Sequence, residues 1–97
     1  MVELTCLGLA SQWERDQVSA YPELAFFITK LKGLIAQSPE RGLPAPLLLR
    51  DGRKLPCRKH AVSLKLFPPR YAIGYSSLVA TYLPSDDEIF IIQFCYS

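Results

Sequence analysis

The stretch Leu24–Ile35, LAFFITKLKGLI, decides the fold of this chain. Its apolar residues recur with i, i+3, i+4, i+7 spacing, and its threonine and two lysines fall outside that stripe. This spacing is typical of a helix with one apolar face. Pro22 suits the first turn of a helix, and Ser38-Pro39 stops one because proline cannot donate to the helical ladder. We therefore predict a long helix between these prolines that packs on a sheet.

The segment before this helix predicts a strand and a shorter helix. Val2–Leu9 is rich in apolar residues that suit a strand, and the first of them alternate with Glu3 and Thr5. Ser11 is followed three residues later by Glu14, the spacing of a capping box at a helix start. We expect a short helix from about Gln12 to Val18.

The segment after the long helix is expected to begin with a hairpin. Pro46–Arg50 and Arg53–Leu55 flank Asp51-Gly52, a dipeptide that favours a tight turn between two strands. With Pro56 as an edge or bulge position, the return strand is able to continue into Lys59–Phe67, where side chains alternate in character.

The C-terminal third predicts further strands. Pro68-Pro69 indicates a turn, after which Arg70–Tyr75 and Leu78–Leu83 are either one bulged strand or two. Ser85–Glu88 predicts a last turn, and Ile89–Tyr96 is apolar enough for a central strand buried on both faces. The fold class predicted for residues 1–97 is a single α+β domain. An N-terminal strand and two helices would pack on a mostly antiparallel sheet of four to five strands.

Composition favours a cytoplasmic domain with no membrane-spanning helix and no cofactor. Glu3 stands where a secretory signal would carry basic residues, and no apolar stretch is long enough to cross a bilayer. The three cysteines show no C-x-x-C spacing, so neither a disulfide framework nor a metal site is indicated.

The charge of the chain is distributed unevenly. Residues 50–70 contain seven lysines and arginines against one aspartate, a net charge of +6, whereas the rest of the chain carries −4. Such asymmetry is typical of a surface that meets phosphate or an acidic partner. Basic residues that alternate along a strand are also a common way to solvate one face or protect an edge.

The predicted order of elements resembles that of the RelE/ParE toxin superfamily of bacterial toxin–antitoxin systems. Leu31–Pro39 looks like the helix end of that family, and Arg70–Tyr75 looks like one of its strand motifs. The resemblance implies a type II toxin that acts as a ribosome-associated mRNA endonuclease, with an antitoxin protein and RNA or the ribosome as partners.

Metal-independent RNA cleavage needs cations for the phosphate and groups that transfer protons. Arg58 and His60 would share one face of a strand, and the family resemblance adds Arg70 and Tyr96 as catalytic candidates. The candidates for RNA binding are Arg53, Lys54, Lys59 and Lys65. The alternative is a non-catalytic protein-binding module of the same fold, with an antitoxin or a gyrase-like partner. It is favoured by a C-terminus that offers Tyr96 without a basic neighbour.

Overall fold

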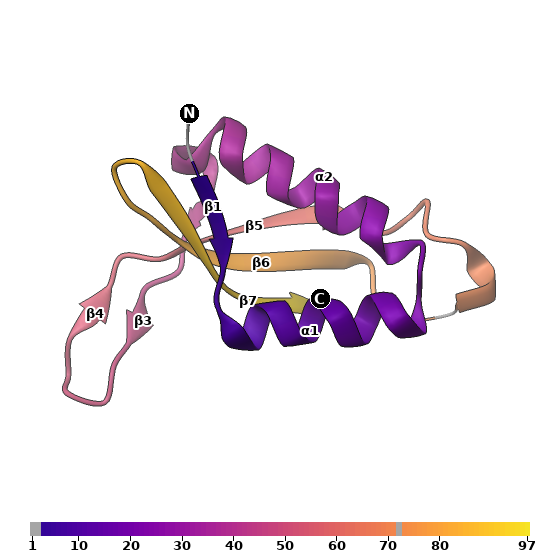
Figure 1. Ribbon diagram of the computed structural model, residues 1–97, viewed down its shortest axis with the longest axis horizontal. Helices are drawn as coiled ribbons and strands as arrows, with labels where there is room; N and C mark the ends of the chain where they lie inside the picture. The colour runs from indigo at the N-terminus through magenta and orange to yellow at the C-terminus, as the bar shows by residue number, and fades with distance from the viewer. Residues whose placement is uncertain (1–2, 72) are drawn as a thin grey trace.

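A computed structural model describes residues 3–71 and 73–97 of the chain (Figure 1). The elements in chain order are β1 (Glu3–Cys6), α1 (Gly8–Ala20), α2 (Leu24–Gln37), the 3-10 turn η1 (Pro39–Arg41), β2 (Leu43–Pro44), β3 (Leu47–Leu48), β4 (Lys54–Leu55), β5 (Arg58–Ser63), the 3-10 turn η2 (Pro69–Tyr71), β6 (Ser77–Pro84) and β7 (Glu88–Tyr96). The predicted α+β fold class is confirmed, because an N-terminal strand and two helices accompany a mostly antiparallel sheet.

The main sheet has five strands in the order β1-β7-β6-β5-β2. β1 pairs with β7 in parallel, and the other pairs are antiparallel. The register between β6 and β7 shifts between Thr81 and Tyr82, which marks a bulge in this hairpin. Both helices lie on the same side of the sheet (Figure 1).

The core fills the space between the two helices and one face of the sheet. α2 contributes a stripe of buried residues at the predicted spacing, and α1 adds Ala10. Trp13 of α1 stacks on Phe94 of β7 with ring centroids 5.6 Å apart, which fixes this helix on the sheet. The buried apolar residues of this core are Ala10, Leu24, Phe27, Ile28, Leu31, Ile35, Val62, Leu64, Phe67, Leu78, Ala80, Tyr82, Ile89, Ile91 and Phe94.

The first helix begins earlier than the sequence indicates. The chain turns at Leu7, so β1 ends at Cys6 and α1 begins at Gly8. The backbone N–H of Ser11 donates to the carbonyl oxygen of Leu7, as it would inside a helix, and no side chain caps the helix start. The capping-box prediction at Ser11 is therefore wrong. Val2 lies outside the described residues.

The connection between β5 and β6 also differs from the prediction. β5 ends at Ser63, and the described part of Arg70–Tyr75 forms a 3-10 turn and a loop, so β6 is a single strand. The prolines before and at the start of η2 remove two donors that a strand would need. Phe67 and Tyr71 instead pack against Tyr21, with ring centroids 6.1 and 5.5 Å from it. Ala72 lies outside the described residues.

The last strand is central but is covered on one face only. β7 lies between β1 and β6, as expected. Ile89, Ile91 and Phe94 are buried beneath the helices, whereas Phe90 and Cys95 on the other face are only half-buried. The prediction that this strand is buried on both faces is wrong for the isolated chain, because both helices lie on the same side (Figure 1).

A two-stranded ribbon formed by β3 and β4 is separate from the main sheet. Figure 1 shows it projecting from one end of the molecule, and we call residues 47–55 the arm. The predicted hairpin is confirmed, since Leu47 pairs with Leu55 and Leu48 with Lys54. Its turn is one residue longer than predicted, because the N–H of Leu49 donates to the carbonyl oxygen of Arg53, which leaves residues 50–52 as the turn. Gly52 turns the chain with a φ of +89°, a conformation that glycine adopts without strain.

Candidate functional site

The basic side chains of residues 50–70 are spread over separate parts of the molecule. Arg53 and Lys54 belong to the arm, Lys59 lies on the exposed side of β5, and Lys65 follows the end of β5. The arm and the loop after β5 project at opposite ends in Figure 1, whose horizontal axis spans 42 Å. The four candidates for RNA binding therefore do not line one groove.

Arg58 and His60 share one face of β5, as predicted. Exposure alternates along the strand, so that both are half-buried and Lys59 between them is exposed. Their shared face is the one that carries buried Val62, and it is turned toward the helices. One terminal nitrogen of Arg58 donates to the carbonyl oxygen of Gly42 at 2.7 Å, which ties β5 to the segment after η1.

The other two catalytic candidates are also engaged by neighbours. Arg70 forms an exposed ion pair with Glu23, which precedes α2, and its guanidinium lies 5.1 Å from the ring centre of Tyr71. The hydroxyl of Tyr96 donates to the side-chain oxygen of Gln17 at 2.8 Å. Burial raises the pKa of the Tyr96 hydroxyl to about 12, and this disfavours its use as a proton acceptor near neutral pH.

Sheet register shows how far apart the candidates lie. Arg58 is opposite Tyr82, whereas Tyr96 is opposite Leu78, which is four residues earlier in β6. The Cα atoms of Arg58 and Tyr96 are therefore about 16 Å apart, because they are separated by four residues along the strands and by two strand spacings across the sheet. This structure does not place the four catalytic candidates around one phosphate; they are Arg58, His60, Arg70 and Tyr96. Their catalytic role stays a prediction, and this arrangement does not favour it.

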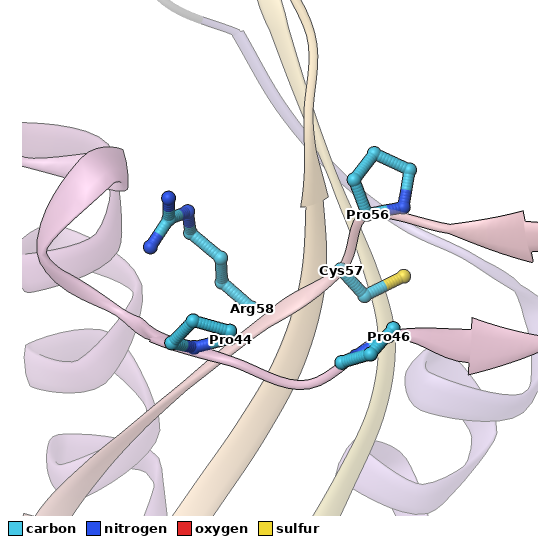
Figure 2. A pocket seen from close by; sticks show the side chains of 5 residues that line it. All are labelled: Pro44, Pro46, Pro56, Cys57 and Arg58. Atoms are coloured by element: carbon cyan, nitrogen blue, oxygen red, sulfur yellow. The ribbon is translucent and has the colours of Figure 1, made fainter.

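The base of the arm holds a mostly apolar hollow of about 250 Å³. Figure 2 shows its lining, in which Cys57 and Arg58 point to opposite sides of the chain. The residues that line it are Pro44, Pro46, Pro56, Cys57 and Arg58. The backbone holds the two sides together, because the N–H of Ala45 donates to the carbonyl oxygen of Cys57 at 2.8 Å.

Burial determines the character of Cys57 in this hollow. The residue is 2% exposed, and desolvation raises the pKa of its thiol, although a backbone hydrogen bond from Leu47 acts in the opposite direction. The thiol is therefore neutral near pH 7 and contributes apolar surface rather than a nucleophile. Within the described part of the chain, no three His, Cys, Asp or Glu side chains are placed to hold a metal ion.

No family model, curated protein or solved structure matches this chain. The resemblance to RelE/ParE toxins is therefore carried by the sequence motifs alone. No helix in the described part of the chain is long and apolar enough to cross a membrane.

Exposed leucines of the arm lie next to the hollow. Leu48 is 66% exposed, and Leu47 is 37% exposed. Leu43 is 64% exposed but lies on the other face of the sheet, because its partner in the register is Lys59. Sequence reasoning missed this site because it treated the prolines only as signals that stop a helix or edge a strand. The sequence does contain a signal for this site, because residues 43–49 and 55–56 include three prolines and five leucines. Neither residue type is favoured on a hairpin that only water surrounds.

Proposed function

We propose that this chain is a non-catalytic protein-binding domain that resembles RelE/ParE toxins in the order of its elements. Its partner would be an acidic, amphipathic segment of the kind that an antitoxin supplies. The observation that carries the proposal is the apolar hollow at the base of the arm, with exposed leucines and uncompensated cations around it.

The apolar part of this surface supports binding to another polypeptide. A hollow of about 250 Å³ accommodates one large apolar side chain, and side chains buried in this way dominate the energy of most protein interfaces. Leu48, two residues after Pro46 of the lining, adds exposed apolar surface next to it. Exposed apolar surface next to a hollow is typical of a site that a partner covers.

The charges around the hollow favour an acidic partner. Arg50 and Lys54 are exposed on the arm, and the acid of the arm, Asp51, pairs with Arg53 at 2.6 Å. Gly42 accepts a hydrogen bond from only one nitrogen of Arg58, so this guanidinium keeps donors for a carboxylate. Complementary charges of this kind increase the rate and the specificity of association.

The backbone around the hollow is already restricted before a partner arrives. Pro44, Pro46 and Pro56 each fix one backbone angle, which reduces the conformational entropy that binding would remove. The same residues provide no N–H groups that would need a partner when the hollow is covered. These features are suited to recognition by a preformed surface.

Selection from random peptides displayed on phage tests the proposal. We expect the immobilised protein to enrich peptides in which a large apolar residue is next to aspartate or glutamate. A synthetic peptide with the enriched sequence would then be titrated by fluorescence anisotropy. Leu48→Asp should weaken its binding at least about tenfold, because a burial term of ~1.5 kcal/mol or more is lost and a repelling charge is gained.

Leu66→Asp is the matched control, since Leu66 is 87% exposed and lies in the loop after β5, outside the arm. Binding should be unchanged in this variant. The proposal would be refuted by the absence of any enriched sequence. It would also be refuted if both variants weakened binding equally.

A further inference from the structure

The strand β7 carries more apolar residues than its own chain covers. Its sequence, EIFIIQFCY over residues 88–96, is the near-continuous apolar run of a strand buried on both faces. The helices cover only one of these faces (Figure 1). We call the other side of the main sheet the open face. Its half-buried apolar residues, none of which packs against the core, are Val79, Leu83, Phe90, Ile92 and Cys95.

Charged side chains of opposite sign border the open face. Lys59 of β5 lies on it, because its partner in the register is Thr81 and its neighbours His60 and Arg58 point the other way. Glu88 begins β7 at the opposite border, where the hydroxyl of Thr5 donates to its carboxylate at 3.0 Å. Neither Lys59 nor Glu88 takes part in an ion pair among the described residues.

Leu83 lies midway between these two charges. Along β6 it follows Thr81, the partner of Lys59, by two residues. Leu83 also precedes Ser85 by two residues. Ser85 is next to Glu88, because its N–H donates to the carbonyl oxygen of Glu88. β6 is also the strand between β5 and β7. Lys59 and Glu88 are therefore about 16 Å apart on the open face, with Leu83 at the centre of the line that joins them.

We propose that the open face is an interface between two copies of this chain, related by a twofold axis that passes over Leu83. A twofold axis at this point places Lys59 of each copy over Glu88 of the other. Leu83 then meets its own equivalent, and the apolar residues around it are removed from water. Each contact occurs twice, as in any interface of this symmetry.

A second copy fits this face better than an unrelated acidic segment does. The face carries a cation, Lys59, on one side of its apolar centre and carboxylates, Glu88 with its register partner Glu3, on the other. A segment with charges of a single sign would leave either Lys59 or Glu88 unpaired next to the buried centre, which is costly. The same chain turned by half a rotation satisfies both charges. The hollow at the base of the arm is a separate surface, so this inference does not depend on the proposed function.

Charge reversals test this arrangement. The wild-type protein should form dimers in sedimentation equilibrium over a range of concentrations. Lys59→Glu and Glu88→Lys should each raise the dimer dissociation constant by about tenfold or more, because each creates two like-charge contacts. A mixture of the two variants should restore dimers. In the mixed pair, the introduced glutamate of one variant faces the introduced lysine of the other at one contact. The unchanged Lys59 and Glu88 face each other at the second contact.

Two further variants separate this outcome from misfolding. Leu83→Asp should abolish dimers because it places two carboxylates against each other at the axis, whereas Leu66→Asp should leave them intact. Circular dichroism would verify that each variant is folded. A wild-type protein that stays monomeric at every concentration would overturn the proposal. Failure of the mixed charge variants to associate more tightly than either variant alone would overturn it equally.

Discussion

The hydroxyl of Tyr82 on β6 donates a hydrogen bond of 2.5 Å to the carbonyl oxygen of Pro39, which begins η1. Tyr82 itself is fully buried, so this bond joins the centre of the sheet to the segment that leads into the hollow. The backbone N–H of Gly42 contacts the same hydroxyl, while the carbonyl of Gly42 accepts from Arg58. These contacts therefore connect the wall of the hollow to the buried core.

Tyr82→Phe should destabilise the protein by roughly 1–2 kcal/mol, because it leaves buried backbone groups without their partner. Urea unfolding followed by the fluorescence of Trp13, the single tryptophan of the chain, would measure the change. Tyr75→Phe is the matched control, since Tyr75 is 54% exposed and keeps its aromatic ring in the variant. Equal stability of the two variants would contradict the role assigned to the Tyr82 hydroxyl.

Gly42→Ala should be destabilising even though the position has no unusual backbone angle. An added Cβ would come within 3.0 Å of the carbonyl oxygen of Lys59 and closer still to the hydroxyl of Tyr82. Overpacking of this kind typically costs ~1–3 kcal/mol. Gly33→Ala should instead stabilise by about 0.5–1 kcal/mol, because it lies in the interior of α2 with no atom near the new methyl group. Thermal melts of both variants would show opposite shifts.

Alkaline pH should destabilise the protein through Tyr96. Burial is the main cause that raises its pKa to about 12, whereas an unfolded tyrosine ionises near pH 10. Below about pH 10 both states bind this proton. Between about pH 10 and 12 the unfolded state loses it first, so the free energy of unfolding falls as the pH rises.

Tyr96→Phe should reduce this loss of stability between about pH 10 and 12, measured by urea unfolding at a series of pH values. Part of the loss should persist, because burial raises the pKa of Tyr82 as well. Identical pH profiles for the wild type and Tyr96→Phe would show that Tyr96 is not responsible.

The ion pair between Arg70 and Glu23 should add little stability. Both side chains are largely exposed, at 67% and 44%, and ion pairs in water are screened. A double-mutant cycle with Arg70→Ala and Glu23→Ala should therefore give a coupling free energy below about 1 kcal/mol. A coupling of several kcal/mol would mean that this pair is part of a more rigid structure than its exposure indicates.

RNA cleavage should not depend on the basic pair of β5. Purified wild-type protein and an Arg58→Ala/His60→Ala variant should leave labelled messenger RNA equally intact, because the catalytic candidates do not converge. Gel analysis of RNA with ribosomes present and absent would measure this. Cleavage by the wild type that the double variant lacks would support the endonuclease prediction against our account.

Local patterns in the sequence were sufficient for the elements with strong periodicity. The stripe of Leu24–Ile35 predicts α2 because helical spacing places those residues on one face, and the observed helix begins at Leu24. Asp51-Gly52 predicts the arm hairpin because this pair favours a reversal of the chain, although the observed turn includes Arg50 as well. Both results depend on residues close together in the sequence.

Contacts between distant residues explain what the sequence did not reveal. Phe67 and Tyr71 are held in a loop by Tyr21, some fifty residues away, so the pattern of Arg70–Tyr75 alone suggested a strand. The charge of Arg58 makes it a candidate in the sequence, but its contact with Gly42 and its place beside three prolines require the folded chain. Of the residues that line the hollow, Arg58 is therefore the one that the sequence marks as a site residue.

Nuclear magnetic resonance tests the central claim, that a partner binds at the base of the arm, most directly. The phage-selected acidic peptide would be titrated into ¹⁵N-labelled protein and the shifts of backbone amide signals recorded. We predict that the largest shifts lie at Ala45, Leu47, Cys57 and Arg58, which surround the hollow. Shifts concentrated instead on the loop after β5 or on the helices would contradict the account.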